Sequence, residues 1–206
     1  MPRPAESVET ITLPDAFWDD LKQILGLLSQ TLLAELTDQP GHYIANKLKP
    51  LIDQVRKLVQ SKEGAWNAET LAGVQFALAD ALWHFGEQSG TDAPLEESIE
   101  LYRKVLEKWT RDGAPRQWAL AQIRLGNALA RLGEQSETGD SGIPRLRAAA
   151  DAYREALKEY TRDAAPRYWA GIQINIATTL DVLGERTRER EKLEQAAEAI
   201  AKHCRY

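Results

Sequence analysis

The sequence has few of the features that mark secreted, metal-binding or membrane proteins. Its 206 residues include a single cysteine, Cys204, so neither a disulfide framework nor a multi-cysteine metal site can form within one chain. The apolar runs are only a few residues long, far short of the roughly 20 residues that span a bilayer. The first ten residues, MPRPAESVET, contain no apolar segment of the kind that signal peptides carry. We therefore expect a cytoplasmic protein without a membrane partner.

An excess of positive charge is also missing. Lys and Arg number 26 against 31 Asp and Glu, which gives a net charge of -5. Proteins that bind nucleic acid usually carry a basic patch, so we expect no nucleic-acid partner. Apolar residues at 43% and charged residues at 28% are ordinary for a globular chain.

Motifs that would indicate an enzyme are absent or misplaced. The sequence contains neither a glycine-rich phosphate-binding loop nor a helical pair of metal-binding histidines. Residues 139–142 (GDSG) resemble the nucleophile segment of trypsin-like serine proteases, but they fall in a loop of variable length between predicted helices. We therefore expect a protein that is not an enzyme and that holds no cofactor and no metal.

Identical residues recur along the chain at fixed intervals. Intervals of 51 residues separate Tyr102 from Tyr153, Gln122 from Gln173, Trp118 from Trp169 and Gly133 from Gly184, and intervals of 47 separate Gln75 from Gln122 and Gly86 from Gly133. The difference of four residues arises in one place, between each glycine and the next apolar stripe, which is where a loop tolerates insertion. Self-similarity at a fixed period of this length is typical of a solenoid.

Each copy reads as two helices. The first has a stripe with helical spacing, represented by Trp118, Gln122, Leu125, Leu129 and Leu132, and the second has an equivalent stripe at Leu146, Ala150, Tyr153, Leu157 and Tyr160. Pro115 and Pro166 suit the first turn of a helix. Gly86, Gly133 and Gly184 are predicted to cap helix C-termini. We therefore expect helix pairs over approximately 65–115, 116–166 and 167–206.

The repeated residues resemble a known family. Leu125-Gly126, Leu129 and Gly133, followed by Ala149, Tyr153, Ala156-Leu157 and Pro166, are similar to the pattern of the tetratricopeptide (TPR) repeat. The usual period is about 34 residues, and the longer copies here resemble an expanded bacterial variety. The resemblance covers residues 69–204. It implies an all-α fold, a right-handed α-solenoid of antiparallel helix pairs, and a scaffold for protein–protein interaction.

The N-terminal third does not repeat. Residues 1–12 are predicted to be flexible, and residues 13–62 form two apolar helical stripes separated by a turn at Gln39-Pro40-Gly41. We interpret 13–62 as a helical hairpin that caps the TPR-like repeats of 63–206, because the end of a solenoid needs a different outer face.

A row of mostly polar residues runs beside the apolar stripes of the first helices. Stacked repeats place their first helices along a concave surface, so we expect this row to contact a protein or peptide partner. Two guanidinium groups that flank an amide could hold a carboxylate or the carbonyl groups of an extended peptide. The alternative is that the row is solvated helix surface. We call it the polar row; its predicted members are Asp80, His84, Arg124, Asn127, Arg131, Asn175 and Thr178.

The C-terminal end of the chain carries no polar capping helix. Ile200, His203 and Cys204 stand where the preceding copy has Tyr153, Ala156 and Leu157. An uncapped repeat exposes apolar surface, which indicates either a homo-oligomer or a surface for another partner. A longer repeat protein cut at this point would have the same ending. The alternative function is thus a structural, self-associating helical-repeat oligomer with no ligand in its groove.

Overall fold

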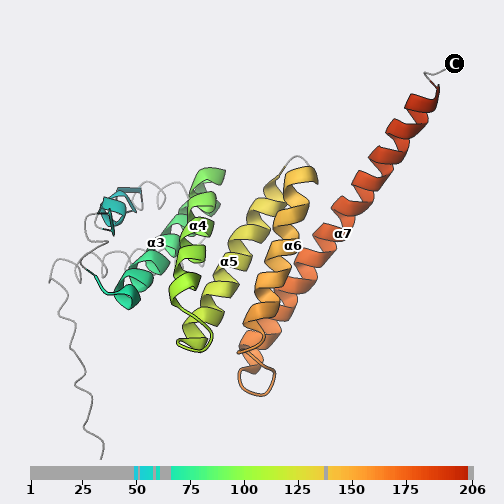
Figure 1. Cartoon of the computed structure of the whole chain (residues 1–206). Helices are drawn as coiled ribbons and strands as arrows, with labels where there is room; N and C mark the ends of the chain where they lie inside the picture. The colour runs from blue at the N-terminus through green and yellow to red at the C-terminus, as the bar shows by residue number, and fades with distance from the viewer. Residues whose placement is uncertain (1–48, 51, 58, 61–65, 137–138, 204–206) are drawn as a thin grey trace, which may run out of the picture.

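The computed structural model describes residues 49–50, 52–57, 59–60, 66–136 and 139–203 (Figure 1). Residues 1–12 and most of the predicted N-terminal hairpin lie outside these ranges. Over residues 66–203 the described helices are α3 (Ala68–Ser89), α4 (Asp92–Lys108), α5 (Pro115–Gln135), α6 (Gly139–Ala156) and α7 (Pro166–His203). The described residues contain no strand, so the predicted all-α class is confirmed.

Consecutive helices pack against one another along the chain. α3 packs on α4 and α5 packs on α6, while α4–α5 and α6–α7 contacts join one pair to the next (Figure 1). α5 also contacts both α3 and α7, so the first helices of the copies lie in a row. This arrangement is a helical solenoid, as the repeat predicts.

The repeated loop sequences TRDGAP and TRDAAP form the same turn. The hydroxyl of Thr110 accepts a hydrogen bond from Gly113 N at 3.2 Å, and that of Thr161 accepts one from Ala164 N at 3.2 Å. Each turn delivers a proline, Pro115 or Pro166, to the first position of the next helix. The predicted role of both prolines is therefore confirmed, because their missing N–H groups fall where no helical partner exists.

The three repeated glycines do not cap helices, which corrects the prediction. Gly86 and Gly133 lie inside α3 and α5, where a Cβ atom would stand 2.7 Å from Leu95 Cγ and 2.8 Å from Leu146 Cγ, respectively. Their function is to let the two helices of a pair approach closely. The C-cap of α3 is Gly90 instead, whose φ of 66° is left-handed.

The core runs continuously through the helix pairs and reaches the N-terminal segment. Ile52 and Val55 belong to the same buried cluster as the apolar residues of α3–α6. Arg56 makes a two-pronged contact with Glu97 of α4, Nε to Oε1 at 2.9 Å and Nη2 to Oε2 at 2.8 Å. Residues 52–57 thus pack as a helix against the first repeat.

The third copy departs from the predicted helix pair. α7 is one helix of 38 residues that passes through Gly184 without a turn. Its first half takes the place of α3 and α5, but its second half does not return as α4 and α6 do (Figure 1). The prediction of a second antiparallel helix in 167–206 is therefore wrong for this structure.

Candidate protein-binding site

The structure brings four members of the polar row together in two equivalent pairs. Arg124 Nε of α5 lies 3.3 Å from Asp80 Oδ1 of α3. Asn175 Nδ2 of α7 donates to Asn127 Oδ1 of α5 at 3.3 Å. Because Asp80 and Asn127 are equivalent in the repeat, as are Arg124 and Asn175, the same polar contact joins each first helix to the next.

Two tyrosines from the second helices complete these contacts. Tyr102 Oη donates to Asp80 Oδ1 at 2.5 Å, and Tyr153 Oη donates to Asn127 Oδ1 at 2.8 Å. A buried phenol needs an acceptor for its O–H group, and the polar row supplies one in each repeat. Sequence reasoning placed both tyrosines on an apolar stripe and missed these hydroxyl contacts. The signal was present in their 51-residue spacing, which matches that of Arg124 and Asn175.

Burial determines the electrostatics of the first pair. It raises the pKa of the Asp80 carboxyl, while the positive charge of Arg124 and the hydrogen bond from Tyr102 act in the opposite direction. Burial and the neighbouring carboxylate both raise the pKa of Tyr102. The Asp80 side chain is 16% exposed and that of Arg124 34% exposed. Arg124 is therefore engaged in holding a poorly solvated carboxylate.

His84 and Arg131 are half-buried and lie further along the same helices. Burial, and then the charge of Arg124, lowers the pKa of His84 to about 4, so its ring is neutral at pH 7. The ring packs edge-to-face on Trp83 with centroids 4.6 Å apart. Among the described residues, His84 Nδ1, Arg131 Nε and Arg124 Nε are buried without a hydrogen-bond partner, although Arg124 Nε keeps its ion pair with Asp80. The remaining predicted member, Thr178, is exposed on α7.

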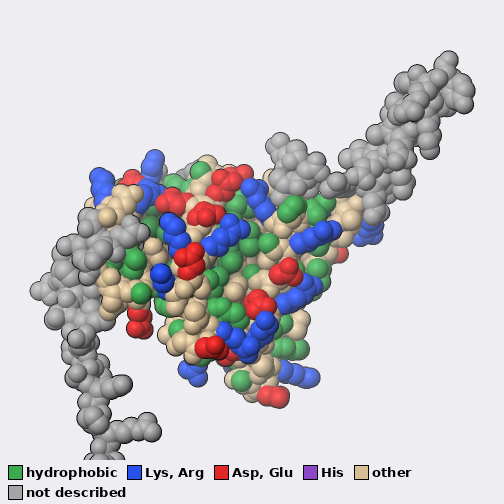
Figure 2. Space-filling model, viewed as in Figure 1, with side chains coloured by type: hydrophobic (Ala, Val, Ile, Leu, Met, Phe, Trp, Pro, Cys, Tyr) green, Lys and Arg blue, Asp and Glu red, His purple; other side chains and the backbone are tan. Residues whose placement is uncertain are grey.

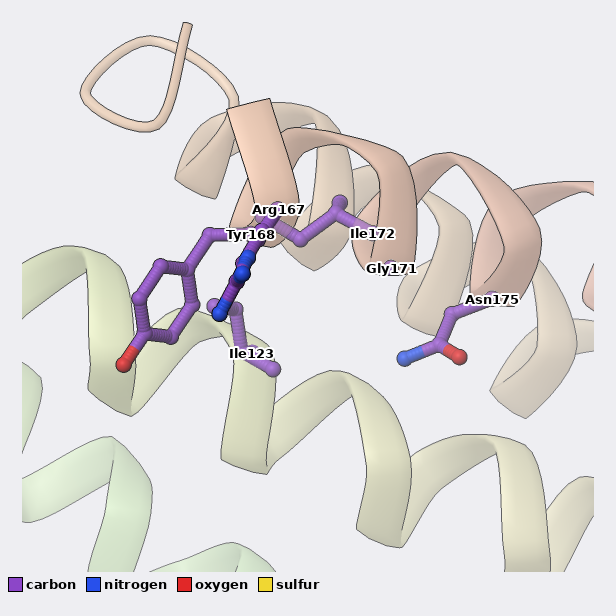
Figure 3. Close-up of a pocket in the computed structure, with 6 residues that line it drawn as sticks. All are labelled: Ile123, Arg167, Tyr168, Gly171, Ile172 and Asn175. Atoms are coloured by element: carbon purple, nitrogen blue, oxygen red, sulfur yellow. The ribbon is translucent and has the colours of Figure 1, made fainter. Parts of the chain in front are cut away.

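A hollow of about 460 Å³ lies between the start of α7 and α5, lined by Ile123, Arg167, Tyr168, Gly171, Ile172 and Asn175 (Figure 3). We call it the α5–α7 hollow. Tyr168, Gly171 and Asn175 follow helical spacing, so they continue the polar row toward the N-terminus of α7. The Tyr168 side chain is exposed, and its ring stacks on Tyr160 with centroids 4.7 Å apart. Of the lining residues, sequence reasoning singled out Asn175 alone as a candidate contact.

Other surface features of the described residues are less distinctive. Acidic and basic side chains are interspersed over the face shown in Figure 2. Within the described ranges, no three His, Cys, Asp or Glu side chains are grouped as a metal site would require. Among the helices that the structure describes, none combines the length and apolar character needed to cross a membrane.

Fold and site together define a helical-repeat solenoid whose first helices are joined by recurring polar contacts. No protein-family model matches the chain, and no curated protein matches it. Among solved structures, the chain is similar to the de novo designed helical repeat protein DHR64, at 18% identity over 91% of this chain and 93% of that one, with a TM-score of 0.44. It is also similar to the DHF58 filament, at 16% identity over 89% and 96% of the two chains, with a TM-score of 0.44.

Proposed function

We propose that the protein is a non-catalytic scaffold of tetratricopeptide type, which binds an extended segment of a partner protein along the polar row and in the α5–α7 hollow. The observation that carries this proposal is the hollow itself. It opens on the surface of the first helices, which is the side that the repeat pattern assigns to binding.

The lining of the hollow indicates what kind of segment would fit. Ile123 and Ile172 offer an apolar floor, and Tyr168 offers an aromatic ring held in place by its stacking on Tyr160. Arg167 extends from the same turn as Tyr168 toward α5 (Figure 3). An apolar or aromatic side chain next to an acidic residue would therefore satisfy the site.

The polar row supplies further contacts next to the hollow. Asn175 belongs to both the row and the hollow, and its amide could bind the backbone of an extended peptide. Arg124 is engaged with Asp80, so we assign the charged contacts to Arg167 and Arg131. No step of this proposal needs a cofactor or a covalent reaction.

The test is a selection of peptides from a phage-displayed random library against the whole protein. Affinities of the enriched peptides are then measured by fluorescence anisotropy. We expect Arg167→Glu with Tyr168→Ala to weaken binding about tenfold or more, because it removes both the charge and the ring from the hollow.

The matched control is Arg154→Glu on α6. It makes the same charge change at an exposed side chain outside the hollow, where Arg154 pairs with Asp151 of its own helix. The control should bind as the wild type does. Equal affinities for the wild type and the hollow variant, or a selection that enriches no peptide, would contradict the proposal.

A further inference from the structure

The first half of α7 carries a face that is covered in the preceding copies and bare here. Leu129 of α5 is 4% exposed, whereas Leu180 at the equivalent position of α7 is 40% exposed. Ala177 is exposed too, although its equivalent, Gly126, is buried against Tyr153. In the second copy α6 covers this face, so α7 presents a surface shaped for one more antiparallel helix.

The chain contains a segment that matches this surface, but the turn that would bring it back is missing. Residues 86–95 (GEQSGTDAPL) align without a gap with residues 184–193 (GERTREREKL). The first copy turns at Gly90, with φ 66°, and has Pro94 in the first turn of α4. Arg188 and Lys192 replace these two residues in the third copy. Both are good helix formers, and Arg188 would be strained in a left-handed conformation, so the helix continues.

A contact between α7 and α5 anchors α7 beyond Gly184. Arg186 Nη1 donates to Ser136 O at 2.6 Å and Nη2 donates to Glu134 O at 2.5 Å, so the guanidinium binds two backbone carbonyl groups at the C-terminal end of α5. The 38 residues of α7 extend about 57 Å at 1.5 Å per residue. The far part of this helix projects beyond the other helices (Figure 1). While α7 is straight, its own second half cannot cover the bare face.

We propose that a second copy of the chain covers it, by reciprocal exchange of residues 187–203 between two antiparallel α7 helices. In the α5–α6 pair, Leu146 lies against Gly133 and Tyr153 lies against Gly126. The same register places Leu193 of the second copy against Gly184.

The register of the α5–α6 pair also places Ile200 of the second copy against Ala177. Because the two helices are antiparallel, each copy both gives and receives these contacts. The interface is therefore two-fold symmetric and closed. Exchange completes the third helix pair in both copies without any partner other than the chain itself.

Site-directed disulfides in the full chain test the exchange. Two proteins are prepared in a Cys204→Ser background, one with Ala177→Cys and the other with Ile200→Cys, and are mixed, denatured, refolded together and oxidised. We expect a covalent heterodimer of the two variants. For the wild type, we expect light scattering to give a mass of twice 23.1 kDa. In a chain with both cysteines, exchange yields intermolecular disulfides. A monomeric wild type, or a double-cysteine chain whose disulfide is intramolecular, would overturn the proposal.

Restoring the missing turn provides a second test. Arg188→Gly with Lys192→Pro recreates the glycine and proline of the first copy, so we expect the helix to fold back and the dimer to be lost. Arg188→Ala with Lys192→Ala keeps good helix formers in place and should remain dimeric. A dimer that survives the Gly/Pro change would contradict exchange. Binding of a selected peptide to the α5–α7 hollow is measured separately on the same variants, so failure of either proposal is distinguishable from failure of the other.

Discussion

His84 should make the folded protein sensitive to mild acid. Its pKa falls from 6.5 to about 4 because burial and the charge of Arg124 both oppose protonation. The unfolded chain therefore binds a proton at this side chain over a pH range in which the folded protein does not. Stability from this group is complete above pH 6.5 and is lost as the pH falls from 6.5 toward 4. At about 1.4 kcal/mol per pKa unit, the total loss is about 3 kcal/mol, of which about 2 kcal/mol is lost by pH 5.

The assay is urea unfolding at pH 7 and pH 5, followed by far-ultraviolet circular dichroism, for the wild type and His84→Gln. The variant keeps a neutral polar side chain, and subtracting its pH dependence removes the contribution of other titrating groups. One such group is Asp80, whose raised pKa has the opposite effect: protonation of Asp80 favours the folded state as the pH falls. We expect the wild type to lose about 2 kcal/mol more than the variant between the two pH values. An identical loss in both proteins would refute the burial argument for His84.

Two further predictions concern the packing of the helix pairs. Gly126→Ala should lower the free energy of unfolding by about 1–3 kcal/mol, because its Cβ would stand 2.6 Å from the Tyr153 ring. Gly73→Ala should instead stabilise the folded protein by about 0.5–1 kcal/mol, because a Cβ at this position meets nothing within 4 Å. Equal effects of the two alanines in thermal unfolding would contradict the close-approach argument. Tyr102→Phe should cost about 1–3 kcal/mol in urea unfolding at pH 7, since the Asp80 carboxylate then keeps only the contact with Arg124. A cost near zero would show that the hydroxyl is replaceable by water.

The sequence predicted the helices well where two periodicities agreed. The apolar stripes and the repeat spacing together located the α3–α4 and α5–α6 pairs, and the prolines marked two helix starts. The predicted C-cap role of the repeated glycines was wrong, because a glycine at the end of an apolar stripe is compatible with both a C-cap and a close helix contact. Only the position of Leu95 beside Gly86 separates the two roles. The continuous α7 was missed because the stripe persists after Gly184 whether or not the chain turns.

The polar row illustrates a different limit. Helical spacing placed Asp80 on one helix and Arg124 on another, but it says nothing of the distance between helices, so their contact could not be predicted. The α5–α7 hollow was missed for the same reason. Tyr168 lies seven residues, about two helical turns, before Asn175, the first member of the predicted row on α7, and its exposure depends on how α7 packs against α5.

The two proposals assign separate surfaces of the third copy to separate tasks. In the first proposal the polar row and the α5–α7 hollow would contact a partner segment, whereas Ala177 and Leu180 lie on the face that a second copy would cover. Exchange of α7 would give a dimer with two hollows. Two linked sites raise the avidity for a partner that carries two copies of the recognised segment.

The most direct test of the scaffold proposal is a nuclear magnetic resonance titration of the ¹⁵N-labelled protein with a selected peptide. The account predicts that amide shifts concentrate at Ile123, Gly171 and Asn175, around the α5–α7 hollow, and leave the amides of α4 and α6 nearly unchanged. Shifts that instead concentrate on α4 and α6, with the hollow unaffected, would contradict it.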